Sequence, residues 1–130
     1  MVIDTSAIIA ILLGEPEGMP LSHSIVQDNK RIISSFSVLE SSIVIEAKKG
    51  PSGKKELDLL LHRIMAEIIP FNIDQMEIAR IAWSKFGKGR HPASLNIGDC
   101  CSYALSKYSG EALLFKGEDF SKTDLVVVRY

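Results

Sequence analysis

Val2 to Leu13 reads VIDTSAIIAILL, which is a short β-branched run, three polar residues, and an apolar run that lasts until Gly14. This order predicts a strand, a polar turn and a helix. A buried strand that leads directly into a helix is the repeating unit of α/β proteins, in which helices cover a mostly parallel sheet. We therefore expect further pairs of strands and helices along the chain.

Short apolar runs and helical patterns do alternate beyond this segment. Further strands are predicted at residues 31–34, 68–71, 113–115 and 125–128, and helices over residues 37–49, 57–68, 74–87 and 96–108. Ser37 with Glu40, and Asp74 with Glu77, have the spacing of capping boxes. Residues 15–29 predict only a loop with some helix. The whole pattern predicts one domain over residues 1–130, a three-layer α/β/α sandwich with a parallel sheet of about five strands.

The composition is that of an ordinary globular protein. The 130 residues are 46% hydrophobic and 24% charged, which excludes a disordered chain or a collagen-like repeat. The formal net charge of −1 means that a nucleic-acid partner would have to be held by a local basic patch. The two cysteines are adjacent, which is neither a disulfide framework nor a zinc spacing. We expect a cytoplasmic protein with no signal peptide and no membrane anchor.

Three acidic residues fall where such a fold would bring them to one edge of the sheet, and a fourth could reach that edge. Asp4 ends the first strand, and Glu40 lies in the first helical turn after the second. Asp119 follows the strand at residues 113–115, and Asp99 begins a helix after a long loop. In parallel sheets the binding crevice lies at the carboxyl ends of the strands. Two carboxylates about 4 Å apart repel by about 4 kcal/mol at an effective dielectric of about 20, so a cluster needs protons or a cation.

The chemistry of these residues indicates which cation. Ligation by oxygen alone, with no histidine or cysteine, suits Mg²⁺ or Mn²⁺ rather than zinc. Each acid also has a structural interpretation: Asp99 could serve only the helix dipole, Glu40 only a capping box, and Asp119 only a turn. Asp4 is harder to explain in this way, because a carboxylate at the inner end of an apolar strand is costly to bury unless it is paired. The combination of all four favours a functional site.

The acids lie in four segments: VIDTSAIIAIL around Asp4, SFSVLESSIVIEA around Glu40, LNIGDCCSYALSK around Asp99 and LLFKGEDFSKTDL around Asp119. In this order, and over nearly the whole chain, they resemble the successive motifs of PIN-domain ribonucleases, especially VapC-type toxins of toxin–antitoxin pairs. The resemblance implies that the four acids form a catalytic quartet that holds Mg²⁺, with Mn²⁺ able to substitute. Asp4 and Asp99 are then the foremost metal ligands.

The same resemblance implies supporting residues and partners. Thr5 and Ser6 follow the first acid as in the family, and Thr123 matches the hydroxyl residue after the fourth. Glu118 adjoins Asp119 and Asp124 follows closely, so the sequence leaves open whether either assists. The expected function is that of a magnesium-dependent endoribonuclease, toxic to cells, that forms a homodimer and is inhibited by a small antitoxin. A non-catalytic PIN-like scaffold that binds RNA or protein is the alternative.

An acidic pocket repels RNA, so flanking cations are needed to bind the substrate. Lys88 and Arg90 lie in a glycine-rich loop that leads to Asp99, and Lys116 lies close to Asp119 in the sequence. These three are the candidate RNA-binding residues. Arg80 and Lys85 are interpreted as solvated charges on the preceding helix.

Two other mechanisms are disfavoured. Metal-free cleavage by an acid–base pair would need two histidines that work together, and His23, His62 and His91 share no spacing. Cys100 and Cys101 fit buried positions of an apolar helix better than the role of a nucleophile.

Overall fold

In the computed structural model all residues, 1–130, are described. The strands are β1 (Val2–Ile3), β2 (Ile32–Ser34), β3 (Glu67–Ile69) and β4 (Leu113–Leu114). The helices are α1 (Thr5–Leu12), α2 (Gly18–Gln27), α3 (Ser35–Lys49), α4 (Pro51–Arg63), α5 (Ile73–Phe86) and α6 (Ile97–Ser109), with a 3₁₀ turn η1 (Asp119–Lys122). The strands are all parallel and lie in the order β3-β2-β1-β4. None of the helices has the length and apolarity needed to cross a membrane.

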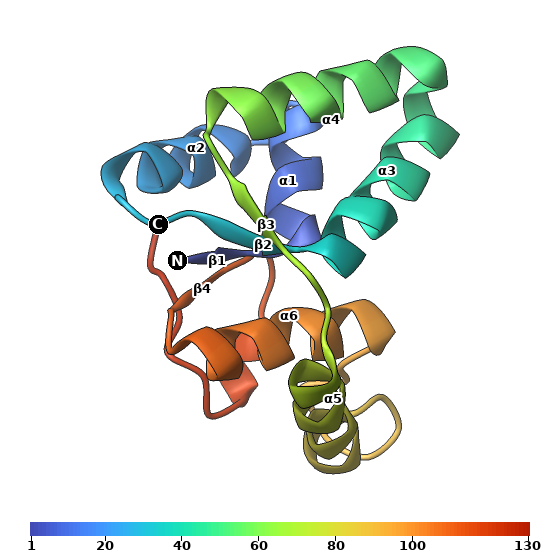
Figure 1. The fold of residues 1–130 in the computed structure, drawn as a ribbon, viewed down its shortest axis with the longest axis vertical. Coiled ribbons are helices and arrows are strands. Elements are labelled where there is room, and N and C mark those ends of the chain that lie inside the picture. The colour runs from blue at the N-terminus through green and yellow to red at the C-terminus, as the bar shows by residue number, and fades with distance from the viewer.

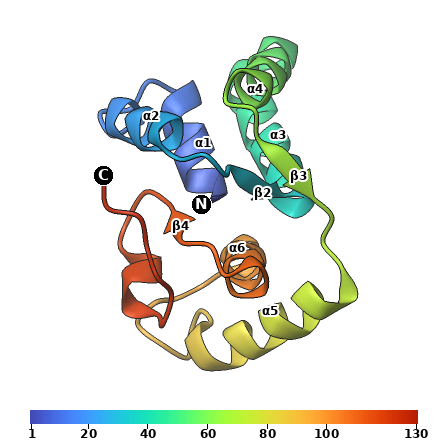
Figure 2. The ribbon, with the colours of Figure 1, turned by 60° about the vertical axis from the view of Figure 1, so that its left-hand side comes forward.

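Helices cover both faces of this sheet. The layer of α1 to α4 lies on one side, and α5 and α6 lie on the other (Figure 1 and Figure 2). The strand residues that enter the core beneath α1 to α4 are Ile3, Ile33 and Leu114. Their neighbours Val2, Ile32 and Leu113 enter the core beneath α5 and α6. This alternation is the period of two expected of strands buried on both faces. The predicted three-layer α/β/α architecture is confirmed.

The sheet has four strands, where about five are predicted. Residues 125–128 meet β4 only at one bridge, between Leu113 and Val127. Two hydrogen bonds flank it: Leu113 N–H donates to the Val126 carbonyl (3.0 Å) and Val128 N–H to the Leu113 carbonyl (2.9 Å). Since β4 itself has only two residues, it offers too short an edge for a full fifth strand.

Both predicted capping boxes are wrong, and the difference matters for the site. Helix α3 begins at Ser35, because the Ser34 hydroxyl caps it by accepting from the Phe36 N–H (3.2 Å). Helix α5 begins at Ile73 and is capped by Asn72. The earlier start of α3 leaves Ser37 and Glu40 free of capping, so that both side chains are available to face other elements. Residues 15–29 contain the ten-residue helix α2.

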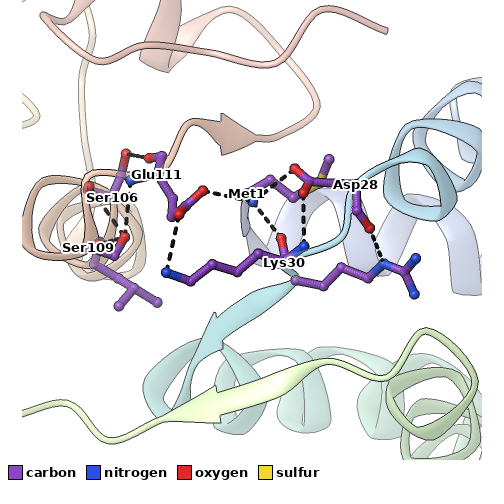
Figure 3. A network of polar contacts seen from close by, with 8 residues as sticks. Met1, Asp28, Lys30, Ser106, Ser109 and Glu111 are labelled. Atoms are coloured by element: carbon purple, nitrogen blue, oxygen red, sulfur yellow. Dashed lines mark hydrogen bonds and ion pairs between the residues drawn. The ribbon is translucent and has the colours of Figure 1, made fainter.

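A polar network joins the segments at the amino ends of the strands (Figure 3). The Met1 ammonium contacts Asp28 Oδ2 (3.0 Å), Glu111 Oε2 (3.3 Å) and the Lys30 carbonyl (2.6 Å). The Ser106 hydroxyl of α6 donates to the Glu111 carbonyl (2.6 Å). This network lies at the start of β1, whereas Asp4 follows the carboxyl end of that strand.

Candidate active site

Asp4 leaves β1 at its carboxyl end and caps α1. Its Oδ2 accepts from the Ser6 N–H (2.9 Å) and the Ser6 hydroxyl (2.6 Å), and its Oδ1 accepts from the Ser102 hydroxyl of α6 (2.5 Å). The residue is only 3% exposed. Three donors offset the cost of burying this carboxylate. They also fix its orientation between β1 and α6.

Asp99 lies in the first turn of α6 and completes a capping box. The Asn96 side chain accepts from the Asp99 N–H (2.9 Å), and Asp99 Oδ2 accepts from the Asn96 N–H (3.0 Å). The pKa of Asp99 is raised to about 7, chiefly by burial, while the Asn96 N–H lowers it. Three neighbouring carboxylates raise it as well: Asp4, Asp119 and Glu40. Asp99 is therefore a cap that also faces the other three acids.

Glu40 reaches from α3 to the start of α6. A Cβ on the buried Gly98 would lie 2.3 Å from Glu40 Oε2 and 2.6 Å from Oε1, so the carboxylate rests directly against the Gly98 backbone. Burial raises the pKa of Glu40, the Thr5 hydroxyl opposes that rise, and the charge of Asp4 adds to it. Only glycine leaves room for Glu40 here.

Asp119 opens η1 and is exposed. Its charge acts on Asp99, as described above, whereas Asp124 is engaged elsewhere. Asp124 accepts from the Tyr103 hydroxyl (2.6 Å) and pairs with Lys107 (3.0 Å). Of the two, Asp119 is thus the one whose charge acts on Asp99.

The four acids have no cationic partner. None of the ion pairs in the structure includes Asp4, Glu40, Asp99 or Asp119. No three acidic, histidine or cysteine side chains surround a common point closely enough to form a ligand shell as they stand. The donor set itself, carboxylate oxygens with no nitrogen, is the one that Mg²⁺ and Mn²⁺ prefer.

The two cysteines beside the site are inert thiols. Burial raises the pKa of Cys100 to about 11, and the charge of Asp99 adds to the rise. Burial raises the pKa of Cys101 to about 12, with smaller effects from Cys100 and Glu40. Both are protonated at neutral pH, so neither provides a nucleophile or a soft metal ligand.

The supporting residues differ in what they contact. Ser6 binds Asp4 directly, and the Thr5 hydroxyl donates to the Ser37 carbonyl (3.4 Å). Thr123 forms no hydrogen bond with any of the four acids: its hydroxyl donates to the Phe120 carbonyl (2.7 Å). Thr123 therefore closes the η1 turn that carries Asp119.

The candidate RNA-binding residues also differ. Lys88 and Arg90 are exposed in the loop between α5 and α6 and form no ion pair. The Lys116 ammonium, in contrast, forms ion pairs with Glu15 and Glu17. The backbone N–H of Lys116 donates to the Ser6 hydroxyl (2.9 Å). The charge of Lys116 is thus already partnered, while those of Lys88 and Arg90 are available.

Sequence reasoning missed two features of the site. Ser37 and Ser102 are fully buried and lie in contact, with their hydroxyl oxygens 3.3 Å apart. Gly98 holds Glu40 as described above. The available signal was Ser102 itself, since a residue three positions after Asp99 on a helix shares its face.

The raised pKa of Asp99 predicts that Asp99→Asn stabilises the metal-free protein at alkaline pH. An acid whose pKa is raised on folding favours the folded state below its unfolded pKa, and that stability is lost as the pH rises towards the folded pKa near 7. Asparagine still accepts the Asn96 N–H but carries no charge. We expect a gain of about 1–2 kcal/mol at pH 8 after discounting for solvent screening, and little gain near pH 4. Urea unfolding in EDTA at pH 8 and at pH 4 measures this gain in stability. An equal gain at the two pH values would contradict the prediction.

Comparison with known proteins agrees with the fold. Residues 1–126 match the PIN domain. The crystal structure of Mycobacterium tuberculosis VapC20, described as a Sarcin-Ricin loop cleaving toxin, is similar with a TM-score of 0.81 at 15% identity, over 99% of this chain and 98% of that one. A toxin–antitoxin complex from Klebsiella pneumoniae has a TM-score of 0.75 at 17% identity, over 99% and 97%.

The chain belongs to the PIN-domain family, as its motifs suggest. Within that family, Ribonuclease VapC of Mycolicibacterium smegmatis is 51% identical over 128 residues, which are 98% of this chain and 99% of that protein. At this level of identity the chain groups with the VapC ribonucleases.

Proposed function

We propose that this chain is a Mg²⁺-dependent endoribonuclease, with Mn²⁺ able to replace Mg²⁺, and the toxic half of a toxin–antitoxin pair. The observation that carries the proposal is a group of four carboxylates without any cationic partner. Glu40 rests against Gly98 and Asp4 accepts from Ser102, residues that flank Asp99 on α6, and the charges of Asp4, Glu40 and Asp119 all act on Asp99. Such a cluster is stable only with protons or a cation. The names of its VapC relatives support RNA as the substrate.

The surroundings of the four acids suggest a different role for each in metal binding and catalysis. Asp4 and Asp99 would be the foremost ligands, and Glu40 and Asp119 would complete the donor set. When bound there, a divalent cation would neutralise charge on the phosphodiester and lower the pKa of the attacking water. Glu40, held against Gly98, would help to orient that water. In this scheme water attacks the phosphorus and the bond to the 3′ oxygen breaks, so the products would carry 5′-phosphate and 3′-hydroxyl ends.

Cleavage of total cellular RNA by the purified protein tests this function. We expect cleavage with Mg²⁺, none in EDTA, and recovery when excess Mn²⁺ is added. Mapping of the ends should show 5′-phosphates. Cleavage that persists in EDTA, or 2′,3′-cyclic phosphate ends, would contradict the proposal. Binding without cleavage under all conditions would favour the non-catalytic scaffold.

Lys88→Glu with Arg90→Glu is expected to weaken RNA binding about tenfold at low salt and to reduce the salt slope by about 1.4, since two phosphate contacts are lost. Fluorescence anisotropy at several salt concentrations, in EDTA to prevent cleavage, measures both quantities. Lys54→Glu with Lys55→Glu is the matched control, because those exposed lysines lie on α4 in the opposite layer. An unchanged slope for the loop variant would remove Lys88 and Arg90 from the RNA-binding surface.

We further propose a homodimer and inhibition by a small antitoxin. Exposed apolar surface is available for such partners: a groove of about 860 Å³ lies between α5 and the starts of α3 and α6, bordered by Phe36, Ile81, Trp83 and Ile97. The segment at residues 57–68 has less exposed apolar surface for a partner, since Leu57 and Leu61 are buried in the core. Light scattering of the purified chain would measure the oligomeric state.

A further inference from the structure

We propose that Ser102 is a positioning residue for Asp4 and that Ser37 acts through Ser102. This buried serine pair joins three separate elements: Ser37 lies on α3, Ser102 on α6, and Asp4 at the end of β1. Both serines are 0% exposed, and Asp4 is 3% exposed. The inference rests on the proposed function, because the role assigned to Asp4 is that of a metal ligand.

The direction of the hydrogen bonds among Ser37, Ser102 and Asp4 follows from which oxygens carry a hydrogen. Asp4 Oδ1, as a carboxylate oxygen, can only accept, so the Ser102 hydroxyl donates to it (2.5 Å). That donation uses the only hydrogen of the Ser102 hydroxyl. In the Ser37–Ser102 contact (3.3 Å) Ser37 must therefore be the donor. The chain of donors runs from Ser37 to Ser102 to Asp4, and the charge of Asp4 orients both hydroxyls.

The two oxygens of Asp4 are not equivalent in this arrangement. Oδ2 already accepts two hydrogen bonds, from the N–H and the hydroxyl of Ser6. Oδ1 accepts only one, from Ser102. Since a carboxylate oxygen has about two lone-pair sites, Oδ1 is the oxygen with room for a further contact. Ser102 therefore holds the oxygen that is open to a cation.

The chain contains two serines that serve as matched controls. Ser106 lies one turn further along α6 and is also buried, but it donates to the Glu111 carbonyl in the network at the amino ends of the strands (Figure 3). Ser41 lies one turn after Ser37 on α3, is fully buried, and has no hydrogen-bond partner. Replacing either by alanine removes a buried hydroxyl from the same helix without touching Asp4.

The experiment measures Mn²⁺ affinity of the full chain without RNA, by electron paramagnetic resonance of unbound Mn²⁺. Loss of a hydrogen bond that orients a ligand typically weakens metal binding by about 10- to 100-fold, so we expect about tenfold for Ser102→Ala and about threefold for Ser37→Ala. The double variant should match Ser102→Ala, because Ser37 acts only through Ser102. Ser106→Ala and Ser41→Ala should bind like the wild type. RNA cleavage by Ser102→Ala should recover as Mn²⁺ is raised.

The outcomes separate the inference from the function beneath it. Wild-type affinity in Ser102→Ala overturns the inference alone, as does an equal loss in Ser106→Ala, which would indicate a general effect of the missing hydroxyl. If Ser102→Ala fails to fold, Ser37→Ala against Ser41→Ala decides, and equal affinities of those two overturn the inference. A wild type that binds no Mn²⁺ and cleaves no RNA overturns the proposed function and this inference together.

Discussion

Asp4→Asn is expected to lower the rate of RNA cleavage by about 10³-fold or more, while the protein still folds. Loss of one ligand charge from the site removes several kcal/mol of stabilisation from the transition state, and about 4 kcal/mol corresponds to that factor. The substitution should preserve the fold because asparagine is a good helix cap and its oxygen can accept from the Ser6 N–H. The asparagine amide can then donate to Ser102, whose hydroxyl turns to donate to Ser37.

Cleavage rates at saturating Mg²⁺, thermal unfolding, and growth of cells that express the variant measure the three consequences. Asp58→Asn is a suitable control, since Asp58 is exposed on α4, a helix that carries none of the four acids. We expect the control to remain active and toxic. An Asp4→Asn protein that cleaves within about tenfold of the wild type would exclude Asp4 as a principal ligand.

Much of this site could be predicted because three of its four acids come shortly after strands. Asp4 follows a buried β-branched strand, and parallel strands bring their carboxyl ends to one edge, so local patterns sufficed to expect a cluster. The residues at which the helices begin were harder to predict. The Ser37 and Glu40 spacing suits a capping box, but Ser34 lies at the end of β2 and begins the helix one turn earlier. Local spacing cannot distinguish the two when several serines are adjacent.

The contacts that refine the site were beyond the sequence for a different reason. Ser102 and Asp4 are separated by 98 residues, and Ser37 and Ser102 by 65. Nothing in the local pattern of α6 indicates that Ser106 and Ser109, in its third and fourth turns, differ from Ser102 in its second, or which of the three meets Asp4. Lys116 illustrates the converse: its position beside Asp119 suggests RNA, whereas the fold brings Glu15 and Glu17 to its ammonium.

Gly98→Ala is expected to reduce cleavage about 100-fold without loss of stability. The new methyl group would occupy the place of the Glu40 carboxylate, 2.3 Å from its Oε2, and the flexible end of Glu40 must move away. A misplacement of about 1 Å in a catalytic group can cost about 10²-fold in rate. The helix itself gains, since alanine is favoured over glycine by up to about 1 kcal/mol in a helix. Activity and stability should therefore change in opposite directions.

A double-mutant cycle with Glu40→Ala tests the cause of that loss. Once the glutamate side chain is absent, Gly98→Ala meets no carboxylate, so it should slow cleavage little further and should stabilise the protein more than it does in the wild-type background. Urea unfolding and single-turnover cleavage of the four proteins measure both couplings. If Gly98→Ala cleaves RNA as fast as the wild type, cleavage does not depend on the position of the Glu40 carboxylate against Gly98. Equal additional losses in both backgrounds would show that the methyl group acts through some other contact, because a clash with Glu40 disappears with Glu40.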